Sequence, residues 1–226
     1  MSYDEEEARM EAAREEYEEE IGKTYLREFG HELLYEEHYE EAVKEFTAER
    51  LQSYYVAHPH LAGPAHESLV YAQSLMPSYP KAALVFAATA TELSVKTVLL
   101  KPIVFGLVHT EGLASFIMDL TTQHTGMERF QTLLAEILAQ FGGVDLKIYK
   151  RPDSAIGLWQ EIGEVIRVRN AVVHRGEPVD DSKAGLGIAV ASTLLNEIFP
   201  QVLSKLHLHL HEPMTVCART HPRPTE

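Results

Sequence analysis

The sequence contains one cysteine, Cys217, among its 226 residues. A single thiol excludes a disulfide framework within the chain. The first residues are acidic, whereas a secretory signal begins with basic residues followed by an apolar run, so no such signal is expected. The most apolar run, residues 82–91, is too short to span a bilayer and is followed by Glu92 and Lys96. These absences predict a soluble cytoplasmic protein that does not enter a membrane.

Positive charge is also scarce, with 20 Lys and Arg against 34 Asp and Glu. Residues 1–50 hold 18 of the acidic and 6 of the basic side chains, so the surplus negative charge belongs to an N-terminal arm. The rest of the chain is nearly neutral, and a general nucleic-acid-binding surface of the basic-patch kind is not expected. We predict that the arm, residues 1–57, is a solvated helix. Two further hypotheses are that it docks a protein partner or screens an active cleft as a polyanion mimic.

Helical periodicity dominates the remainder of the chain after a linker at residues 58–63. Predicted helices cover residues 65–75, 81–100, 112–122, 127–141, a helix capped by Asp153 or Ser154 and ending near residue 175, and a last helix from Asp180 to about residue 206. Pro102 is expected to end or kink the second of them. No segment alternates convincingly as a strand, although residues 146–149 are a candidate extended piece. The predicted fold class is all-α, a helical bundle over residues 64–212 with the acidic arm before it and a Pro- and His-containing tail, residues 213–226, after it.

One predicted helix carries an arginine where a hydrophobic residue is normal. At 100° per residue, Arg169 points out of the middle of an apolar stripe made of Ile162, Val165, Ile166, Val172 and Val173. A guanidinium in that position is costly unless it is paired or faces a polar groove. Asn170 and His174 are four residues apart, so they lie on the adjoining flank of the same helix. The helix therefore gathers an arginine, an amide and an imidazole along one edge.

Four residues separate Arg169 from His174, and the residue after the arginine is polar. In an all-α setting this pattern resembles the RX4-6H motif of the HEPN superfamily, helical domains that often act as ribonucleases. Residues 79–96 are similar to the apolar, Ala-rich HEPN helix that carries a glutamate. The resemblance covers roughly residues 64–210 and does not include the arm. Arg167 also fits the motif, with six residues before His174, but it points elsewhere, so Arg169 is taken as the motif arginine.

The resemblance implies metal-independent RNA cleavage in a composite cleft between two copies of the chain, without a cofactor. His174 would carry the proton transfers near neutral pH, and Arg169 would bind the phosphate oxygens. Asn170 would orient the phosphate or the imidazole. The products would be a 2′,3′-cyclic phosphate and a 5′-hydroxyl, and the implied setting is stress response, defence or a toxin–antitoxin pair.

Glu92 is an auxiliary candidate for this site. It shares a helical face with apolar residues, so we expect it to be partly buried and to pair with a cation, either Arg169 or Lys96. In the functional interpretation it orients Arg169 or tunes a proton transfer. In the structural one it only forms an ion pair.

A different class of function remains open. His174 lies in the last turn of its helix, where it can interact with the negative helix end, and Arg169 can simply lock the bundle by pairing with a carboxylate. The chain would then be a non-catalytic helical interaction or nucleotide-binding module that acts through its arm and its dimer interface.

The C-terminal histidines are the last candidates. His207, His209 and His211 alternate in the sequence, and Cys217 and His221 follow. On a strand, alternate histidines share a face and can chelate zinc, whereas on a helix they splay by 200°. Helical spacing precedes them and prolines follow, so we expect a frayed helix and a loose tail, with no metal assigned.

Overall fold

The computed structural model describes residues 10, 14, 17–21, 23–24, 45–108, 110–123 and 131–218. The chain forms two compact units, Met1–Phe46 and Thr47–Glu226. In the first unit, the described residues up to 24 are helical and exposed. Two exposed ion pairs lie here, Arg14–Glu18 and Lys23–Glu19, and the partners of each pair are four residues apart. The other residues before residue 45 and the tail beyond residue 218, including His221, lie outside the described residues.

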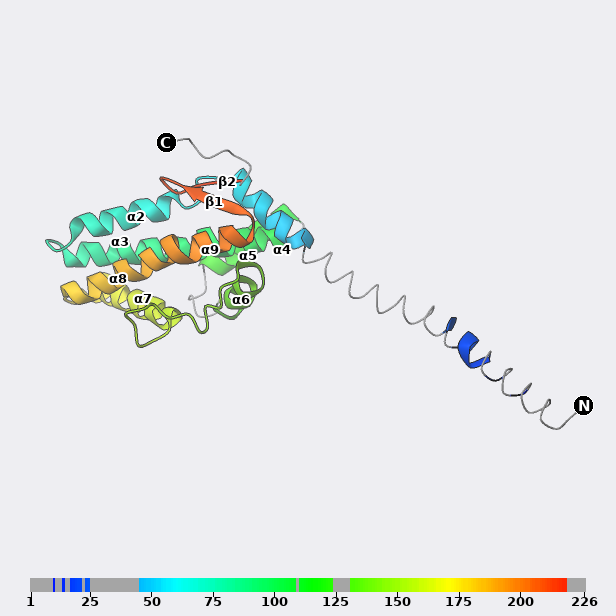
Figure 1. Cartoon of the computed structure of the whole chain (residues 1–226). Helices are drawn as coiled ribbons and strands as arrows, with labels where there is room; N and C mark the ends of the chain where they lie inside the picture. The colour runs from blue at the N-terminus through cyan, green and yellow to red at the C-terminus, as the bar shows by residue number, and fades with distance from the viewer. Residues whose placement is uncertain are drawn as a thin grey trace, which may run out of the picture. The chain divides into compact units, whose positions relative to one another are not determined.

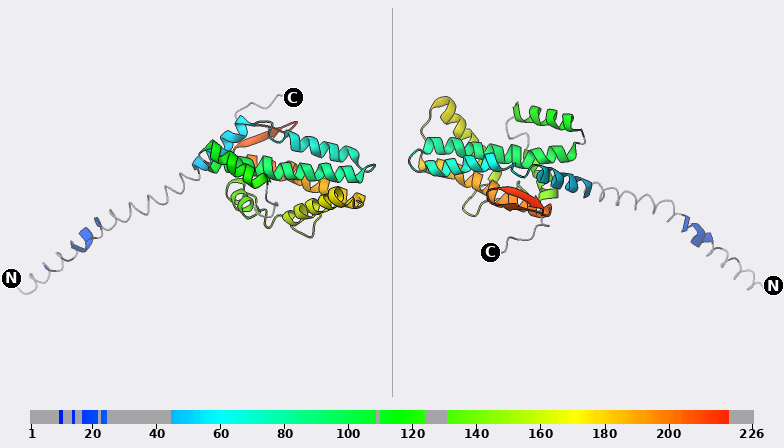
Figure 2. Two further views of the ribbon diagram at one scale, coloured as in Figure 1. Left: turned by 180° about the vertical axis from the view of Figure 1, so that it is seen from behind. Right: turned by 90° about the horizontal axis from the view of Figure 1, so that it is seen from above.

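The second unit is mostly helical, with one two-stranded sheet in its described part, which agrees with the predicted fold class. After a helix at residues 47–57, its elements are α2 (Gly63–Leu75), α3 (Pro80–Leu93), η1 (Ser94–Leu100), α4 (Lys101–Leu107), α5 (Glu111–Gln123), α6 (Gln131–Ile137), η3 (Leu138–Gly142), α7 (Leu158–Arg175), α8 (Asp181–Thr193), η4 (Leu194–Ile198), α9 (Phe199–Lys205), β1 (Leu208–His211) and β2 (Thr215–Ala218). Helix α3 packs between α2 and α8, and α7 packs against α3 and α8 (Figure 1). The views in Figure 2 show the same layers from behind and from above.

The helical body begins earlier in the chain than the sequence indicated. The helix at residues 47–57 buries Leu51 and Tyr55, which are 3% and 1% exposed. It also approaches α4 closely, because a Cβ added to Gly106 would lie 2.8 Å from Leu51 Cδ2. These residues belong to the body, so the boundary predicted after residue 57 lies too far along the chain. The prolines and the glycine of residues 58–64 are typical of a linker, whereas the burial of this helix depends on a contact with α4, far along the chain.

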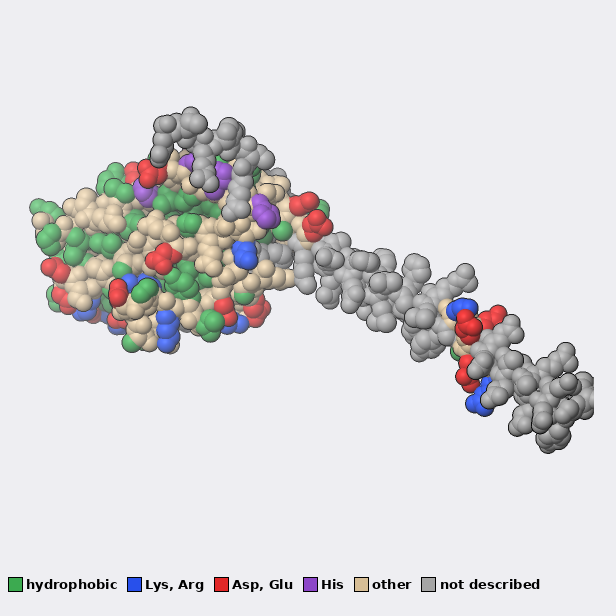
Figure 3. Space-filling view, viewed as in Figure 1, with side chains coloured by type: hydrophobic (Ala, Val, Ile, Leu, Met, Phe, Trp, Pro, Cys, Tyr) green, Lys and Arg blue, Asp and Glu red, His purple; other side chains and the backbone are tan. Residues whose placement is uncertain are grey.

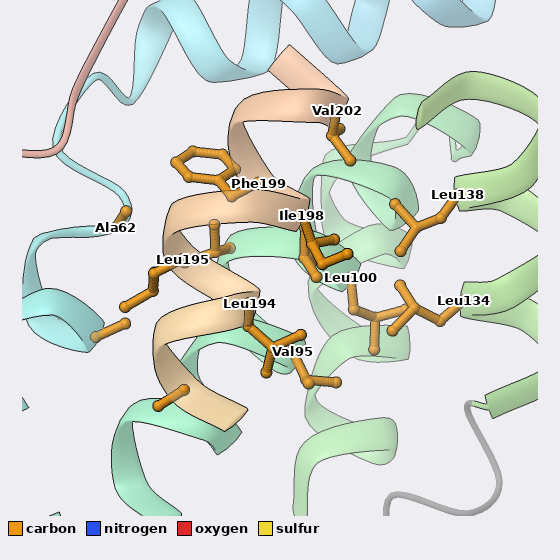
Figure 4. Packing of buried hydrophobic residues seen from close by; sticks show 14 of the residues in the cluster. Ala62, Val95, Leu100, Leu134, Leu138, Leu194, Leu195, Ile198, Phe199 and Val202 are labelled. Carbon is orange, nitrogen blue, oxygen red and sulfur yellow. The ribbon is translucent and has the colours of Figure 1, made fainter. Parts of the chain in front are cut away.

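The core lies where the later helices cross, and Figure 4 shows it from close by. Side chains from η1, from α6 and η3, and from η4 and α9 converge there, all 5% exposed or less: Val95, Leu100, Leu134, Leu138, Leu194, Leu195, Ile198, Phe199 and Val202. Each such burial contributes about 1.5–3 kcal/mol relative to an exposed side chain. This packing fixes α3 and α8, the two helices on which α7 rests.

Two helices continue through a proline by widening into a π-helical segment. Segment η1 comes just before Pro102 and η4 just before Pro200, so α3 continues into α4 and α8 continues into α9. A proline ring clashes with the preceding turn of a regular α-helix and donates no hydrogen bond. The wider π turn relieves that clash. Of the two predicted effects of Pro102, an end or a kink, the end is therefore wrong.

Pro102 cannot donate to the carbonyl of Val98, its α-helical partner four residues earlier. The hydroxyl of Tyr55 donates to this oxygen instead, at 2.8 Å. Both residues are buried, and burial raises the pKa of Tyr55 well above its ordinary value. A tyrosine from one end of the body thus compensates for a proline in a helix far along the chain.

We predict that Tyr55→Phe lowers the free energy of unfolding by about 1–3 kcal/mol, because it leaves the Val98 carbonyl buried without this donor. Chemical denaturation measures the change. Tyr71→Phe is the matched control, since Tyr71 is 49% exposed and its hydroxyl bonds to Glu67 at the surface. Equal, near-zero effects in both variants would contradict the prediction.

Two helical stretches are long and apolar enough to cross a bilayer by length and composition, Pro80–Gly106 and Asp181–Lys205. The first exceeds the run expected from the sequence because the helix continues through Pro102. Their most apolar windows are 61% and 56% buried within the body. Helices that are apolar on most sides are also found at the centre of a folded bundle, so these stretches are weak evidence for a membrane span.

The C-terminal segment forms a β-hairpin, so the predicted frayed helix and loose tail are wrong for residues 208–218. Strand β1 pairs antiparallel with β2, and His209 lies opposite Cys217. Leu208 and Val216 from the two strands are buried in the core at 1% and 2% exposure. This burial against the body favours the hairpin, and it agrees with the short alternation of leucine and histidine over residues 207–211. Residues 146–148, expected to be extended, form a turn.

Candidate functional site

Helix α7, which carries the predicted motif, begins and ends at glycines. Gly157 is the N-cap, and its N–H donates to Gln160 Oε1 at 3.3 Å. The predicted caps Asp153 and Ser154 lie in the preceding loop instead. Gly176 is the C-cap with φ of 69°, a left-handed conformation that glycine adopts without strain. The predicted end of the helix is confirmed.

The buried face of α7 is narrower than the sequence indicated. Ile162 and Val165 are each 1% exposed and Ala171 is 3% exposed. Val173, predicted to lie on the same stripe, is 54% exposed. The last turn of α7 therefore presents both Val173 and His174 to solvent.

Arg169 lies at the border of this face and is held by two side chains. Its Nη2 forms an ion pair with Glu92 Oε1 of α3. Its Nη1 donates to Asn170 Oδ1 at 2.8 Å. The side chains of Arg169 and Glu92 are 24% and 25% exposed, and Lys96 Nζ lies 3.9 Å from the other oxygen of Glu92. Glu92 was expected to pair with either Arg169 or Lys96, and the structure places its carboxylate between the two cations.

His174 lies one turn beyond Asn170 and is exposed at the C-terminal end of α7. Lys81, at the start of α3, donates to the Gly176 carbonyl at 3.2 Å and so ties the two helix ends together. Lys, Arg, Asp and Glu side chains mix along the edge of the body where α7 lies (Figure 3). The structure thus brings Glu92, Arg169 and Asn170 into contact, and it places the imidazole on the same stretch of helix.

No family model, curated protein or solved structure matches this chain.

The chemistry of this site depends on the N–H groups of Arg169 that do not bind Glu92 or Asn170. A guanidinium carries five N–H donors, and the contacts with Glu92 and Asn170 do not use all of them. The remaining donors suit the oxygens of a phosphate, which match the planar fork of arginine. The exposed imidazole of His174 is a common type of acid–base group in catalysis. The site combines an oriented anion-binding group with an acid–base group within two turns of one helix.

A second site, missed in the sequence, is a cavity of about 710 Å³ beside α4. Three of its lining side chains are cationic or imidazole groups, Arg50, His58 and Lys101, and none of the described residues that line it is acidic. The rings of Tyr54 and His58 stack at 4.2 Å, and Tyr54 lies 5.1 Å from the ring of Phe105.

Two spacings in the sequence carry a signal for this cavity. Arg50, Tyr54 and His58 recur every four residues and so share one helical face, as do Lys101 and Phe105. The two faces meet only because the helix continues through Pro102, which the sequence left open between an end and a kink. The Lys101 ammonium lies 5.9 Å from the Phe105 ring centroid, and Arg50 Nη2 donates to the Phe105 carbonyl at 3.2 Å.

The histidine-rich hairpin forms a third cluster. Of the three histidines considered from the sequence, the structure brings His209 and His211 together with Cys217. His207 is not part of this group; it lies before the hairpin with φ of 56°. The cluster formed because the segment adopts strand periodicity, which puts alternate residues on one face.

Proposed function

We propose that this chain is a metal-independent endoribonuclease of the HEPN type that acts as a homodimer in the cytoplasm. The observation that carries the proposal is the position of Arg169. Glu92 and Asn170 hold it at a partly exposed border of α7, and the exposed His174 follows within two turns. One helix therefore carries both a fixed guanidinium with donors that these contacts do not use and an exposed imidazole.

The proposed reaction begins with attack of a ribose 2′-hydroxyl on the adjacent phosphorus. His174 would accept the proton or donate one to the leaving 5′-oxygen. Arg169 would stabilise the negative charge that develops on the phosphorane oxygens. Asn170 would fix the arginine, and Glu92 would act as a positioning residue that sets the direction of the guanidinium fork. The products would carry a 2′,3′-cyclic phosphate and a 5′-hydroxyl.

Two copies are needed because one α7 supplies only one imidazole for two proton transfers. Val173, at 54% exposure, leaves apolar surface next to His174 through which a second copy would pack. We further propose the acidic arm as the docking segment for a protein partner, because the side chains described there are exposed.

The test incubates the full-length protein with labelled mixed-sequence RNA, with EDTA and separately with Mg²⁺. We expect cleavage under both conditions, with cyclic phosphate ends, and a loss of about 10²–10⁴-fold in His174→Ala because a general acid–base group is removed. His66→Ala, on α2, controls for the loss of a histidine as such. Absence of cleavage by the wild-type dimer, or an unchanged rate in His174→Ala, would contradict the proposal.

The cavity lined by Arg50, His58 and Lys101 favours a second candidate function, a nucleotide-binding module without catalysis. Cations would attract the phosphates, and the rings that line the cavity would contact the base. Calorimetry with ADP should show binding that Lys101→Ala weakens about tenfold, the equivalent of one lost charge-assisted contact. Lys150→Ala, outside this cavity, should leave the affinity unchanged. Equal affinities in wild type and Lys101→Ala would reject this function.

A further inference from the structure

The β1–β2 hairpin has two chemically different faces. The register places Leu208 opposite Ala218 and His209 opposite Cys217, so side chains alternate between the faces. Leu208 and Val216 point into the core, at 1% and 2% exposure. The other face carries His209, His211 and Cys217, which are partly or fully exposed. The hydrophobic face fixes the hairpin on the body, and the polar face is left with two imidazoles and a thiol.

These three side chains converge on one point. Cys217 Sγ lies 2.6 Å from His211 Nε2 and 2.9 Å from His209 Nε2. All three potential ligand atoms lie within 4.8 Å of one another. The rings of His209 and His211 approach edge to face with centroids 4.7 Å apart. Nothing in the core packing requires that two imidazole nitrogens and a sulfur be directed at each other.

We infer that this face of the hairpin binds a zinc-class transition-metal ion through His209 Nε2, His211 Nε2 and Cys217 Sγ. Imidazole nitrogen and thiolate sulfur are the ligand atoms that Zn²⁺ prefers, whereas Mg²⁺ and Ca²⁺ prefer oxygen. Tetrahedral Zn–N and Zn–S bonds separate the ligand atoms by roughly 3.5 Å. The observed separations are smaller, so the side chains would open by about an ångström through small χ rotations to admit the ion. The thiol loses its proton on binding.

Three protein ligands leave the fourth tetrahedral position for water or an added ligand. The ion would bridge two strands of four residues each, and an isolated hairpin of that size is marginally stable. Beyond its core contacts, the hairpin is bound to the turn at residues 59–62, which comes before α2. The N–H of Val216 donates to the carbonyl of Pro59 there, at 2.8 Å. Metal binding would therefore stabilise the end of the body that carries this turn.

This site is separate from the motif on α7. The hairpin and α7 lie on opposite sides of the helical body in Figure 1, and the view from above in Figure 2 separates them as well. Histidine side chains lie along the edge of the body where the hairpin lies (Figure 3). Removal of the metal should leave RNA cleavage intact, so failure of one proposal is distinguishable from failure of the other.

The experiment uses the full-length protein, stripped of metal and titrated with Zn²⁺, with Mg²⁺ as the comparison ion. We expect one Zn²⁺ per chain and a higher melting temperature in its presence, with no effect of Mg²⁺. Titration with Co²⁺ should produce a thiolate-to-metal charge-transfer band that Cys217→Ser abolishes. Cys217→Ser and His211→Ala should each weaken Zn²⁺ binding at least tenfold.

His207→Ala is the matched control, because it removes a neighbouring histidine that is not in the cluster, and it should bind Zn²⁺ as the wild type does. The metal-free melting temperatures of all variants show whether each remains folded. No Zn²⁺ binding by the wild type, or equal binding and an unchanged Co²⁺ spectrum in Cys217→Ser, would overturn the inference.

Discussion

Arg169→Ala is expected to lower the rate of RNA cleavage by about 10²–10³-fold, the usual effect of removing one donor that stabilises an oxyanion. The guanidinium is positioned by Glu92 and Asn170, so its remaining donors have a fixed direction before substrate binds. Arg169→Lys keeps the charge but provides a point charge in place of a fork. We expect it to recover only a small part of the activity in single-turnover measurements.

Arg167→Ala separates this prediction from the other reading of the motif. Arg167 has six residues before His174 and is 72% exposed, where it approaches Glu164 at 3.8 Å. Its replacement removes the same charge from the same helix, and the cleavage rate should change less than threefold. A larger loss of cleavage rate with Arg167→Ala than with Arg169→Ala would show that Arg167 is the motif arginine.

Glu92→Gln tests the positioning role without removing the arginine. The amide keeps one hydrogen bond to Arg169 but not the charge, so we expect a lower kcat with an unchanged melting temperature. A purely structural Glu92 would instead lower the melting temperature and leave the cleavage rate of the folded fraction unaltered.

Arg151→Ala is expected to lower the free energy of unfolding by about 3–5 kcal/mol, because it leaves a buried carboxylate without its cation. Arg151 binds Glu161 through two hydrogen bonds, Nε to Oε2 at 2.8 Å and Nη2 to Oε1 at 2.7 Å. The side chain of Glu161 is 3% exposed, in the first turn of α7. The pair fastens the loop before α7 to the helix that carries the candidate site.

Lys147→Ala is the charge-matched control, since its partner Glu136 is 64% exposed and the pair is separated by 3.5 Å. An exposed pair of this kind contributes at most about 1 kcal/mol. Urea denaturation of both variants gives the comparison. Similar losses in the two variants would contradict the assigned importance of the buried pair.

The Arg151–Glu161 pair makes the free energy of unfolding depend on pH in the acidic range. Burial raises the pKa of Glu161, but hydrogen bonds from Arg151 and Ser154 and the charge of Arg151 outweigh it, so the pKa is lowered overall. A lowered pKa in the folded state means that the stabilisation is present above the unfolded value, about 4.3, and is lost as the pH falls through the folded value. Unfolding measured between pH 6 and about pH 3 should show this loss in the wild type and less of it in Glu161→Gln.

Local sequence patterns predicted the features of α7 that depend on neighbours in the chain. Gly176 marks the end of α7 in the sequence. The four-residue spacing of Asn170 and His174 indicates that both lie on one flank of the helix. The start of the helix was predicted less well. Gly157 has no side chain that would mark it as a cap, and the polar residues Asp153 and Ser154 were more typical candidates.

The cluster of two histidines and a cysteine shows why other parts of the structure were harder to predict. His209, His211 and Cys217 share a face only if residues 208–218 are extended, and the preceding residues have helical spacing. Burial of Leu208 and Val216 against a distant part of the body decides between the two conformations. The alternation of leucine and histidine over residues 207–211 is a strand pattern, but it is short and follows helical spacing, so it does not decide the conformation by itself.

By itself, the sequence determined the mainly helical class and placed an arginine, an amide and an imidazole on one helix, because helical periodicity and capping act within a few residues. Only the tertiary structure decided which carboxylate holds Arg169, how a helix continues through Pro102, and where the C-terminal imidazoles and the thiol meet. Each of these outcomes depends on side chains from separate segments that exclude water together, and that free energy exists only once the segments are packed.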